Sequence, residues 1–390
     1  MTTSVFNPSI VQLGLLGLAL LAGIIQLIYY LFFYIQPLRK IREVKAGQVH
    51  HITDLPGVSV IVYANNDSEQ LQKNLKHILE QDYPSFEVVV VNDGSTDETE
   101  QVLSGYESTY NNLYHTFLTD EARNLSRRKL SLTLGIKAAR HDIVLFTNAN
   151  CAPESNQWIK SMARNFSDKT AIVLGCTRLE RKTGKGERFF AFDLLLRSVR
   201  LFGYTLACKP YSAEGTNLGY RKSLFFENKG YAKFMHLHPG DADLFVNQVA
   251  TRFNTKVELA PEAMMTAYFD RNREGWLQIK RESAFTSRFI HSGAKVTFGF
   301  ETLSRYLFWG ASIGTICFWK SGQNYAIAAI VLLFLHFILG GIYWYQAGKS
   351  FNTRRFFFCV PFFELIIPLS NLIIKIDTHI KSKQYYTWHL

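Results

Sequence analysis

Two aspartates follow predicted buried strands, and they are the first side chains of this chain that could bind a ligand. Four consecutive valines at 88–91 are typical of a strand buried on both faces of a parallel sheet, and Asp93 follows that strand. A second apolar run at 58–62 precedes Asp67 in the same way. Ligands bind at the carboxyl edge of open α/β sheets, so these carboxylates could accept hydrogen bonds from ligand N–H or hydroxyl groups. The alternative is an ordinary turn, since Asn, Asp, Gly and Ser are turn formers.

Alternating strand and helix patterns surround these aspartates and predict the elements that position them. We predict strands at 58–62, 88–91 and 142–147, and helices at 68–80, 97–104 and 130–139. The first helix has its leucines and isoleucine on one face, and Ser68 is its expected N-cap. This β-α-β-α order predicts an α/β fold with a doubly wound, mostly parallel sheet.

Several motifs in this region resemble, in order and spacing, those of the family 2 glycosyltransferases. The matching segments are VSVIVYANND at 58–67, QDYP at 81–84, VNDGSTD at 91–97, Lys129 with LGIKAA at 134–139, EGTNLGYR at 214–221, DADL at 241–244, and Gln278 with Arg281. Members of this family are inverting, nucleotide-sugar-dependent enzymes of the GT-A fold. The resemblance covers about residues 58 to 285 and implies a GT-A nucleotide-sugar-binding fold.

The resemblance implies binding roles for two groups of residues. The donor nucleotide sugar would be bound by Asp67, Asp93, Lys129, Asn148 and Asn150. The acceptor or the transferred sugar would be contacted by Glu214, Gly215, Asn217 and Asp243.

The resemblance also implies a catalytic set of Asp241, Gln278 and Arg281. Asp241 would be the general base, because an inverting transfer needs one carboxylate on the face opposite the leaving group. The alternative is a helix N-cap, a role that fits Asp243 better. Gln278 and Arg281 lie three residues apart on one helix face, and a guanidinium suits a leaving diphosphate. A solvated basic helix face beside Lys280 is the alternative there.

Three positions depart from the family pattern. Gly240 replaces a glutamate, Glu282 replaces a tryptophan, and Asn148 and Asn150 replace the aspartates of the Asp-x-Asp motif. Hard divalent cations prefer charged oxygen ligands, so Asn150 would be at most a weak ligand for Mg²⁺ or Mn²⁺.

Three interpretations of the two asparagines remain open. The metal could be held weakly, mostly by the diphosphate. The reaction could be metal-independent, with Arg281, Lys129 and neighbouring basic residues neutralising the leaving group. The chain could also be an inactive relative that binds a nucleotide or a partner.

Apolar segments at both ends predict membrane helices. Residues 10–35 carry no charge and exceed the roughly 20 residues that span a bilayer, and basic residues follow them. The positive-inside rule then places the next domain in the cytoplasm. Further apolar segments lie at 306–319, 325–345 and 356–374. We expect the last, which contains Pro361, Pro368 and Glu364, to be re-entrant or interfacial, because a carboxylate facing lipid is costly.

Composition agrees with a membrane-bound chain. Of the 390 residues 47% are hydrophobic, and the net charge of +11 comes largely from basic residues that flank apolar segments. This pattern favours an anionic membrane surface over nucleic acid as the partner. The five cysteines show no zinc-site spacing and are expected to be reduced thiols. The helix expected at 187–202 either lies in the membrane interface or packs on the sheet.

These observations divide the chain into five predicted regions. They are an N-terminal transmembrane helix (1–37), a basic linker (38–56), a cytosolic GT-A catalytic domain (57–300), a C-terminal membrane region (301–376) and a basic, aromatic tail (377–390).

The predicted function is that of an inverting glycosyltransferase at a bacterial-type inner (plasma) membrane. It would be a multi-pass protein that moves a sugar from a UDP- or GDP-sugar to a lipid-linked or membrane-proximal acceptor in cell-envelope glycan or glycolipid synthesis. The alternative is a catalytically inactive GT-A-fold membrane scaffold in glycan assembly, which Asn148 and Asn150 favour.

Overall fold

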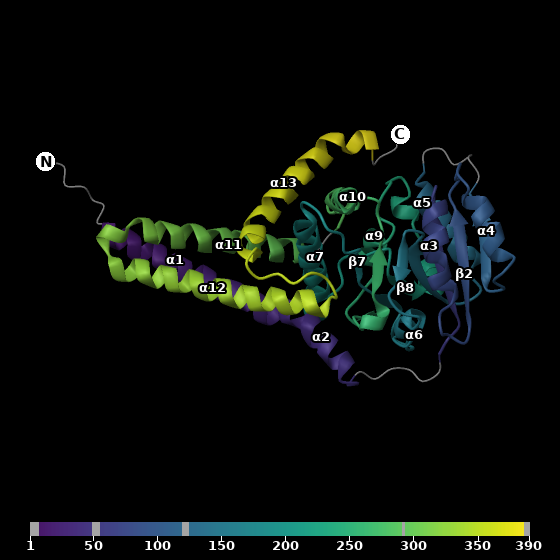
Figure 1. Cartoon of the computed structure of the whole chain (residues 1–390), viewed down its shortest axis with the longest axis horizontal. Helices are drawn as coiled ribbons and strands as arrows, with labels where there is room; N and C mark the ends of the chain where they lie inside the picture. Colours follow the sequence, from purple (N-terminus) through teal and green to yellow (C-terminus); the bar gives the residue numbers. More distant parts are fainter. Residues whose placement is uncertain (1–7, 49–54, 119–124, 291–292, 386–390) are drawn as a thin grey trace.

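The protein consists of an α/β body from which a long bundle of helices projects (Figure 1). The structure is a computed structural model that describes residues 8–48, 55–118, 125–290 and 293–385. Parts of four predicted regions lie outside the described residues: 1–7 of the N-terminal helix, 49–54 of the basic linker, 119–124 and 291–292 of the catalytic domain, and 386–390 of the tail.

A seven-stranded sheet forms the centre of the body. Its strands lie in the order β3-β2-β1-β4-β8-β6-β9. They span Val58–Ala64 (β1), Phe86–Asn92 (β2), Leu113–Phe117 (β3), Ile143–Asn148 (β4), Ile172–Leu174 (β6), Leu218–Arg221 (β8) and Thr255–Val257 (β9). Strand β1 is parallel to β2 and β4, whereas β8 is antiparallel to β4 and β6. The predicted doubly wound, mostly parallel sheet is therefore confirmed.

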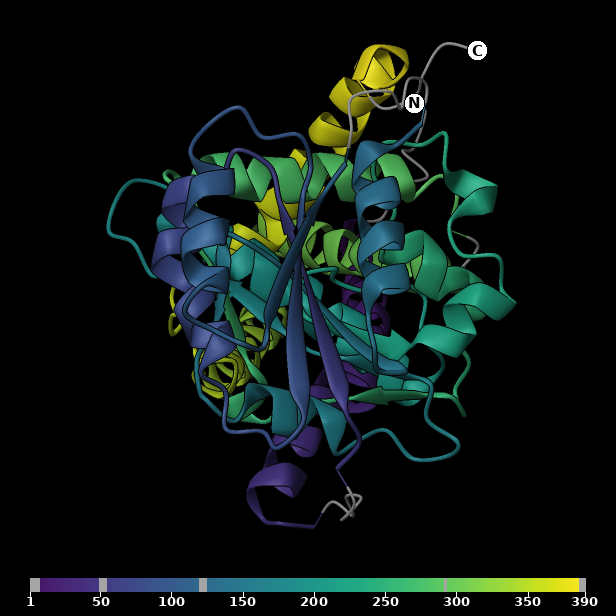
Figure 2. The same cartoon turned by 90° about the vertical axis from the view of Figure 1, so that its right-hand side faces the viewer.

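Helices cover both faces of this sheet, as Figure 2 shows. Those of the body are Ser68–Leu79 (α3), Thr99–Glu107 (α4), Arg127–Ala138 (α5), Trp158–Ala163 (α6), Glu187–Ala207 (α7), Lys222–Glu227 (α8), Asp243–Val249 (α9) and Asn272–Thr286 (α10). The predicted helices at 68–80, 97–104 and 130–139 correspond to α3, α4 and α5.

The strands are buried on both faces because their side chains alternate between two cores. Val58, Val60 and Val62 of β1 pack with the apolar face of α3. Ile61, between them, packs on the other face with the helices α5 and α7. This burial on both sides explains why the sequence shows continuous apolar runs instead of polar–apolar alternation.

A smaller three-stranded sheet lies beside the large one. It consists of Cys151–Pro153 (β5), Met265–Ala267 (β10) and Thr177–Leu179 (β7), in the order β5-β10-β7. Strand β5 begins immediately after Asn150, so the turn between β4 and β5 joins the two sheets.

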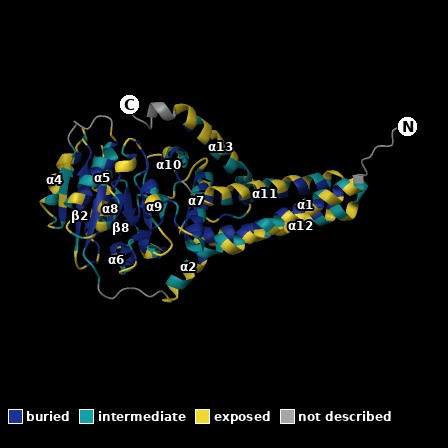
Figure 3. Cartoon of the chain, turned by 180° about the vertical axis from the view of Figure 1, so that it is seen from behind, coloured by how far each residue is buried: buried dark blue, intermediate teal, exposed yellow. Residues whose placement is uncertain are grey.

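The projecting bundle consists of α1 (Pro8–Tyr29), α11 (Gly293–Cys317) and α12 (Gln323–Ser350). Among the described residues, two helices are long and apolar enough to cross a membrane by length and composition: Ser9–Lys45 and Gln323–Ser350. Exposed residues run along the bundle in Figure 3, and many of them are large and apolar, such as Leu21, Phe334 and Leu339. The N-terminal helix also continues, through a π-helical turn at Tyr30–Tyr34, into α2 (Ile35–Lys45). Residues 38–45 of the predicted basic linker are therefore helical.

The last helix, α13 (Val360–Tyr385), differs from the expectation of a segment broken by prolines. Pro361 lies in its first turn, where its missing N–H costs nothing, and Pro368 lies inside the helix. Glu364 does not face outward but is buried, and its Oε1 accepts hydrogen bonds from Trp344 Nε1 (3.0 Å) and Tyr30 Oη (3.2 Å). The cost of exposing a carboxylate to lipid, on which the re-entrant prediction rested, therefore does not arise.

Helix α7 lies between the bundle and the large sheet (Figure 1). It contacts α2, α10 and α13, as well as β7 and β9, and most of its apolar side chains are buried. Of the two roles weighed for this segment, packing inside the molecule is the one that the structure shows.

Candidate functional site

A cavity of about 300 Å³ opens at the carboxyl ends of β1 and β4. Its walls come from both sheets, from helices α5, α7, α9 and α10, and from the loops at 213–216 and 238–242. The charged, amide, imidazole and phenol side chains that line it are Tyr63, Arg128, Asn148, Asn150, Arg178, Arg197, Glu214, His238, Asp241, Asp243, Gln278 and Glu282, and the hydroxyl side chains are Thr177, Thr216, Ser283 and Thr286. The register explains the meeting of Tyr63 and Asn148, which are direct partners in the β1–β4 pairing.

Arg128 is the best-connected cation in this cavity. Its Nε lies 3.2 Å from Asp241 Oδ2, and its Nη2 donates to Asn148 Oδ1 at 3.0 Å. The guanidinium carbon lies 4.5 Å from the centroid of the Tyr63 ring, a cation–π arrangement. Burial alone would lower the pKa of Arg128, but Asp241 outweighs this effect and the pKa is raised. The guanidinium is thus a fixed positive charge in the wall of the cavity.

The basic run at 127–129 occupies the first turn of α5, where the helix dipole disfavours cations. Each cation is compensated by a specific partner. Arg127 Nε lies 2.9 Å from Asp93 Oδ1, Arg128 pairs with Asp241, and the Lys129 ammonium donates to the carbonyls of Leu237 (2.6 Å) and Pro239 (2.8 Å). The start of α5 therefore ties the end of β2 to the loop that carries Asp241.

Lys129 does not line the cavity, which corrects its predicted role in donor binding. Its side chain is fully buried, and burial lowers its pKa to about 8. With its donors used on loop carbonyls, the ammonium cannot reach a diphosphate in this conformation. Lys129 is a positioning residue for the Asp241 loop.

The carboxylate of Asp241 reaches the cavity from a loop that only glycine can form at position 240. Gly240 has φ +102°, and a Cβ there would approach Leu244 Cδ1 to 2.5 Å. This explains why glycine replaces the family's glutamate. Burial alone would raise the pKa of Asp241, but Arg128 and Lys129 lower it overall, so the side chain is ionised at neutral pH.

Asp67 and Asp93 lie at the same sheet edge but do not line the cavity itself. Asp93 Oδ2 accepts from the Tyr63 hydroxyl at 2.7 Å, which connects it to the cavity wall. Asp67 Oδ2 accepts from the backbone N–H of Asn65 at 2.9 Å, and the pKa of Asp67 is raised by burial. Asp67, not Ser68, is the N-cap residue of α3.

Asn148 and Asn150 both line the cavity, but their donor set does not fit a divalent cation. The side-chain oxygen of Asn148 accepts from Arg128, and that of Asn150 lies 3.5 Å from the Cys151 thiol. Both oxygens belong to neutral amides, and the guanidinium of Arg128 already contacts the oxygen of Asn148. The described residues contain no group of three or more His, Cys, Asp or Glu side chains arranged to hold a metal.

Three of the four predicted acceptor residues line the cavity: Glu214, Gly215 and Asp243. Burial raises the pKa of both Glu214 and Asp243. A Cβ on Gly215 would lie 3.2 Å from Asp241 Oδ2, so this glycine lets the loop approach the carboxylate closely. Asn217 is wrong as an acceptor contact: it is buried, donates to the carbonyls of Cys176 and Ala263, and accepts from Trp158 Nε1.

The pair Gln278 and Arg281 is separated by the structure. Gln278 lines the cavity and donates to Glu282 Oε1 at 3.0 Å. Arg281 points to α13, where its Nη2 lies 3.1 Å from Asp377 Oδ2. The predicted contact between Arg281 and a leaving diphosphate is therefore wrong for this conformation.

Sequence reasoning missed several cavity residues, which include Tyr63, Arg128, Arg178, Arg197, His238 and Glu282. One signal pointed to Arg128, because three successive cations at a helix N-terminus contradict the local preference of a helix. In the sequence, Glu282 differed from its neighbours only as a departure from the family motif. In the structure, burial raises the pKa of its carboxyl group. The sequence contains no comparable signal for Arg197, which lies on α7.

Comparisons with known proteins agree with this geometry. Residues 59–226 match the family described as "Glycosyl transferase family 2". The chain is 32% identical over 123 residues to glycosyltransferase AglE of Haloferax volcanii, covering 31% of this chain and 39% of that protein. It is 30% identical over 179 residues to dolichyl-phosphate beta-glucosyltransferase ALG5D of Trichomonas vaginalis, covering 42% of this chain and 52% of that protein. The chain thus spans about half, or less, of the length of these relatives.

A solved structure extends the likeness to nearly the whole chain. The mannosyltransferase PcManGT from Pyrobaculum calidifontis, in complex with GDP-Man and Mn²⁺, superposes with a TM-score of 0.53 at 16% identity. The match covers 90% of this chain and 99% of that one. At this identity the match establishes a shared GT-A fold.

Proposed function

Residues 59–226 form a domain of glycosyl transferase family 2, and on this premise we propose that the chain is an inverting, membrane-bound glycosyltransferase. The observation that carries the proposal is Asp241, an ionised carboxylate held in the wall of a cavity at the carboxyl edge of the sheet. The nucleotide of a UDP- or GDP-sugar would lie against Asp67 and Asp93, and its sugar would enter the cavity.

In the proposed reaction, Asp241 accepts the proton of the acceptor hydroxyl. The acceptor oxygen attacks the anomeric carbon, the bond from that carbon to the diphosphate oxygen breaks, and its electron pair leaves with the nucleoside diphosphate. Configuration inverts because attack and departure occur on opposite faces of the sugar. Glu214 and Asp243, which line the same cavity, would hydrogen-bond to the acceptor or to the transferred sugar.

The bundle supports a lipid-linked or membrane-proximal acceptor. Its helices expose apolar side chains over much of their length, and such a surface is stable in lipid and costly in water. Helix α7 lines the cavity with Leu194 and Arg197 and contacts α2 at the base of the bundle, so the site would lie close to the membrane surface. A relative named for dolichyl phosphate fits the same class of acceptor. The body would then face the cytoplasm of a bacterial-type plasma membrane, beside the basic end of α2.

A binding and turnover experiment on the full-length protein in detergent tests the proposal. A panel of UDP- and GDP-sugars is screened for binding, with Mn²⁺ and with EDTA, and nucleoside diphosphate release is measured with membrane lipid extract. Asp241→Asn should lower kcat by about 10²- to 10⁴-fold and retain donor binding. Asp168→Asn, an exposed aspartate elsewhere on the body, is the matched control.

Two results would contradict the proposal. Failure to bind any nucleotide sugar would exclude a transferase. Donor binding without turnover, together with an Asp241→Asn variant that complements a deletion strain fully, would favour the scaffold alternative raised by Asn148 and Asn150.

A further inference from the structure

We propose that Arg128 does the work that a divalent cation does in metal-dependent GT-A enzymes: its guanidinium binds the donor diphosphate and neutralises the leaving group. This inference rests on the proposed function and adds to it a residue that the family motifs do not mark. It also assigns a reason to the asparagines at 148 and 150.

The position of Arg128 is fixed before any donor arrives. Asp241 and Asn148 hold two of its nitrogens, and the Tyr63 ring supports its flat face. A guanidinium has five N–H donors in a rigid fork, and these two partners occupy only part of them. The remaining donors belong to a side chain that lines the cavity, where phosphate oxygens could be bound bidentately.

The two asparagines suit a guanidinium better than a metal. Asn148 accepts an N–H of Arg128 through a neutral oxygen, so it orients the guanidinium without neutralising it. An aspartate at 148 would pair with the same guanidinium and reduce the charge available to a diphosphate. The Asn150 side chain donates to the Tyr268 carbonyl at 3.1 Å and thereby fastens the β4–β5 turn.

The other cations in this part of the molecule interact with other partners. Lys129 donates to three backbone carbonyls, Arg281 pairs with Asp377, and Arg178 pairs with Glu154 at 2.5 Å. Arg197 also lines the cavity but interacts electrostatically with Glu214 and Asp243, the predicted acceptor residues. Arg128 is the cation that touches the residue proposed as base.

This contact couples the two halves of the reaction. Before the reaction, the negative charge of Asp241 offsets the positive charge of Arg128. When Asp241 takes the acceptor proton, the carboxylate becomes neutral and no longer offsets the guanidinium. The full positive charge then becomes available as negative charge develops on the departing diphosphate.

The test measures binding of UDP and GDP to the full-length protein by calorimetry, in EDTA and in Mn²⁺. The wild type should bind one of them equally well in both buffers. Arg128→Ala should weaken that binding by about ten- to a hundred-fold in either buffer, because a charge-assisted contact is lost. Arg128→Lys keeps the charge but not the fork and should be intermediate. Arg140→Ala, an exposed arginine just after α5, should bind like the wild type.

A rescue variant sharpens the assignment. R128A/N148D/N150D removes the guanidinium and restores both carboxylates, and it should regain nucleotide affinity in Mn²⁺ but not in EDTA. Wild-type binding that disappears in EDTA, or an Arg128→Ala variant that binds like the wild type, would overturn the role of Arg128 and leave the transferase proposal standing. Absence of binding to any nucleoside diphosphate or nucleotide sugar would overturn both.

Discussion

At the scale of single residues, the direction in which a side chain points determines its role as much as its residue type does. Arg128 and Lys129 are neighbours in sequence, yet a helix rotates successive side chains by about 100°. Arg128 therefore reaches the cavity, whereas Lys129 reaches the carbonyls of Leu237 and Pro239 behind it. The same geometry makes one a candidate for binding the diphosphate and the other a support for the loop of Asp241.

The coupling of Arg128 and Asp241 predicts the pH dependence of turnover. The pKa of Asp241 is lowered in the folded protein, so the acid limb of kcat/KM should lie below the ordinary value for aspartate. Arg128→Gln removes the guanidinium that stabilises the charged form and leaves the burial that destabilises it. The acid limb should therefore move to higher pH, as measured from pH–rate profiles of the two proteins.

Two observations would decide this prediction. Arg140→Gln removes an exposed guanidinium whose partner is Glu87, and its profile should superpose on that of the wild type. An acid limb that stays in place in Arg128→Gln would show that Asp241 does not set it.

The position of a residue could be predicted well where a motif places it at a strand end, and less well where a helix or a loop determines the direction of its side chain. Asp93 directly follows β2 and Asn148 is the last residue of β4, and both strands pair in parallel with β1, so the position of both residues at one edge could be predicted. Asn217 and Arg281 belong to motifs, but their side chains turn toward the interior and toward α13. No periodicity in the sequence reports such a rotation.

At the scale of elements, one face of helix α10 lines the cavity and another contacts α13. Gln278 and Glu282 face the cavity, and Arg281 faces α13. The contact between α10 and α13 thus joins a wall of the cavity to the last described helix. Three-residue strands such as β5 and β7 were not predicted, because so short a segment has too little alternation to recognise.

This geometry predicts that Arg281 supports α13 and does not bind the donor. Arg281→Ala should leave nucleoside diphosphate affinity within about twofold of the wild type. It should increase hydrogen exchange in α13 only modestly, because an ion pair at the protein surface contributes little to stability. Asp377→Asn removes the other partner together with its ion pair to Lys381 (2.7 Å), so it should increase exchange in α13 at least as much. A loss of nucleotide binding in Arg281→Ala with unchanged exchange in α13 would restore the family's role for this arginine.

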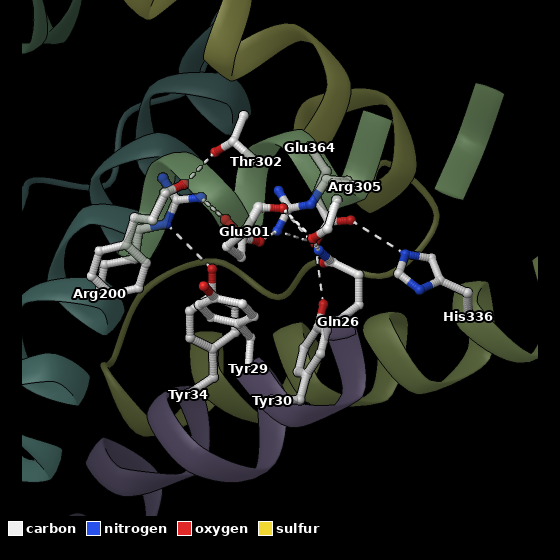
Figure 4. A network of polar contacts seen from close by, with 12 residues as sticks. Gln26, Tyr29, Tyr30, Tyr34, Arg200, Glu301, Thr302, Arg305, His336 and Glu364 are labelled. Atoms are coloured by element: carbon white, nitrogen blue, oxygen red, sulfur yellow. Dashed lines mark hydrogen bonds and ion pairs between the residues drawn. The ribbon is translucent and has the colours of Figure 1, made fainter. Parts of the chain in front are cut away.

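At the scale of the whole molecule, a buried ionic cluster joins the bundle to the body (Figure 4). Its arginines and glutamates are Arg200 on α7, Glu301 and Arg305 on α11, and Glu364 on α13, and His336 Nε2 on α12 lies 3.8 Å from Glu364 Oε2. Glu301 accepts hydrogen bonds from both arginines, and Glu364 lies 3.9 Å from Arg305. The three helices that carry these residues are far apart in sequence, so the sequence suggested isolated charges, whereas the structure shows that the charges compensate one another.

Charge balance in this cluster decides how its variants should behave. The two arginines and two glutamates sum to zero, and Glu301 and Arg305 are fully buried. Arg305→Met leaves one carboxylate uncompensated, which should destabilise the protein by about 3–5 kcal/mol. The double variant R305M/E301Q restores neutrality and should lose markedly less stability.

Lys295→Met, at an exposed position of the same helix, is the control. Thermal unfolding in detergent measures all three. If the double variant were as unstable as Arg305→Met, packing around Arg305, and not charge compensation, would hold the bundle against the body.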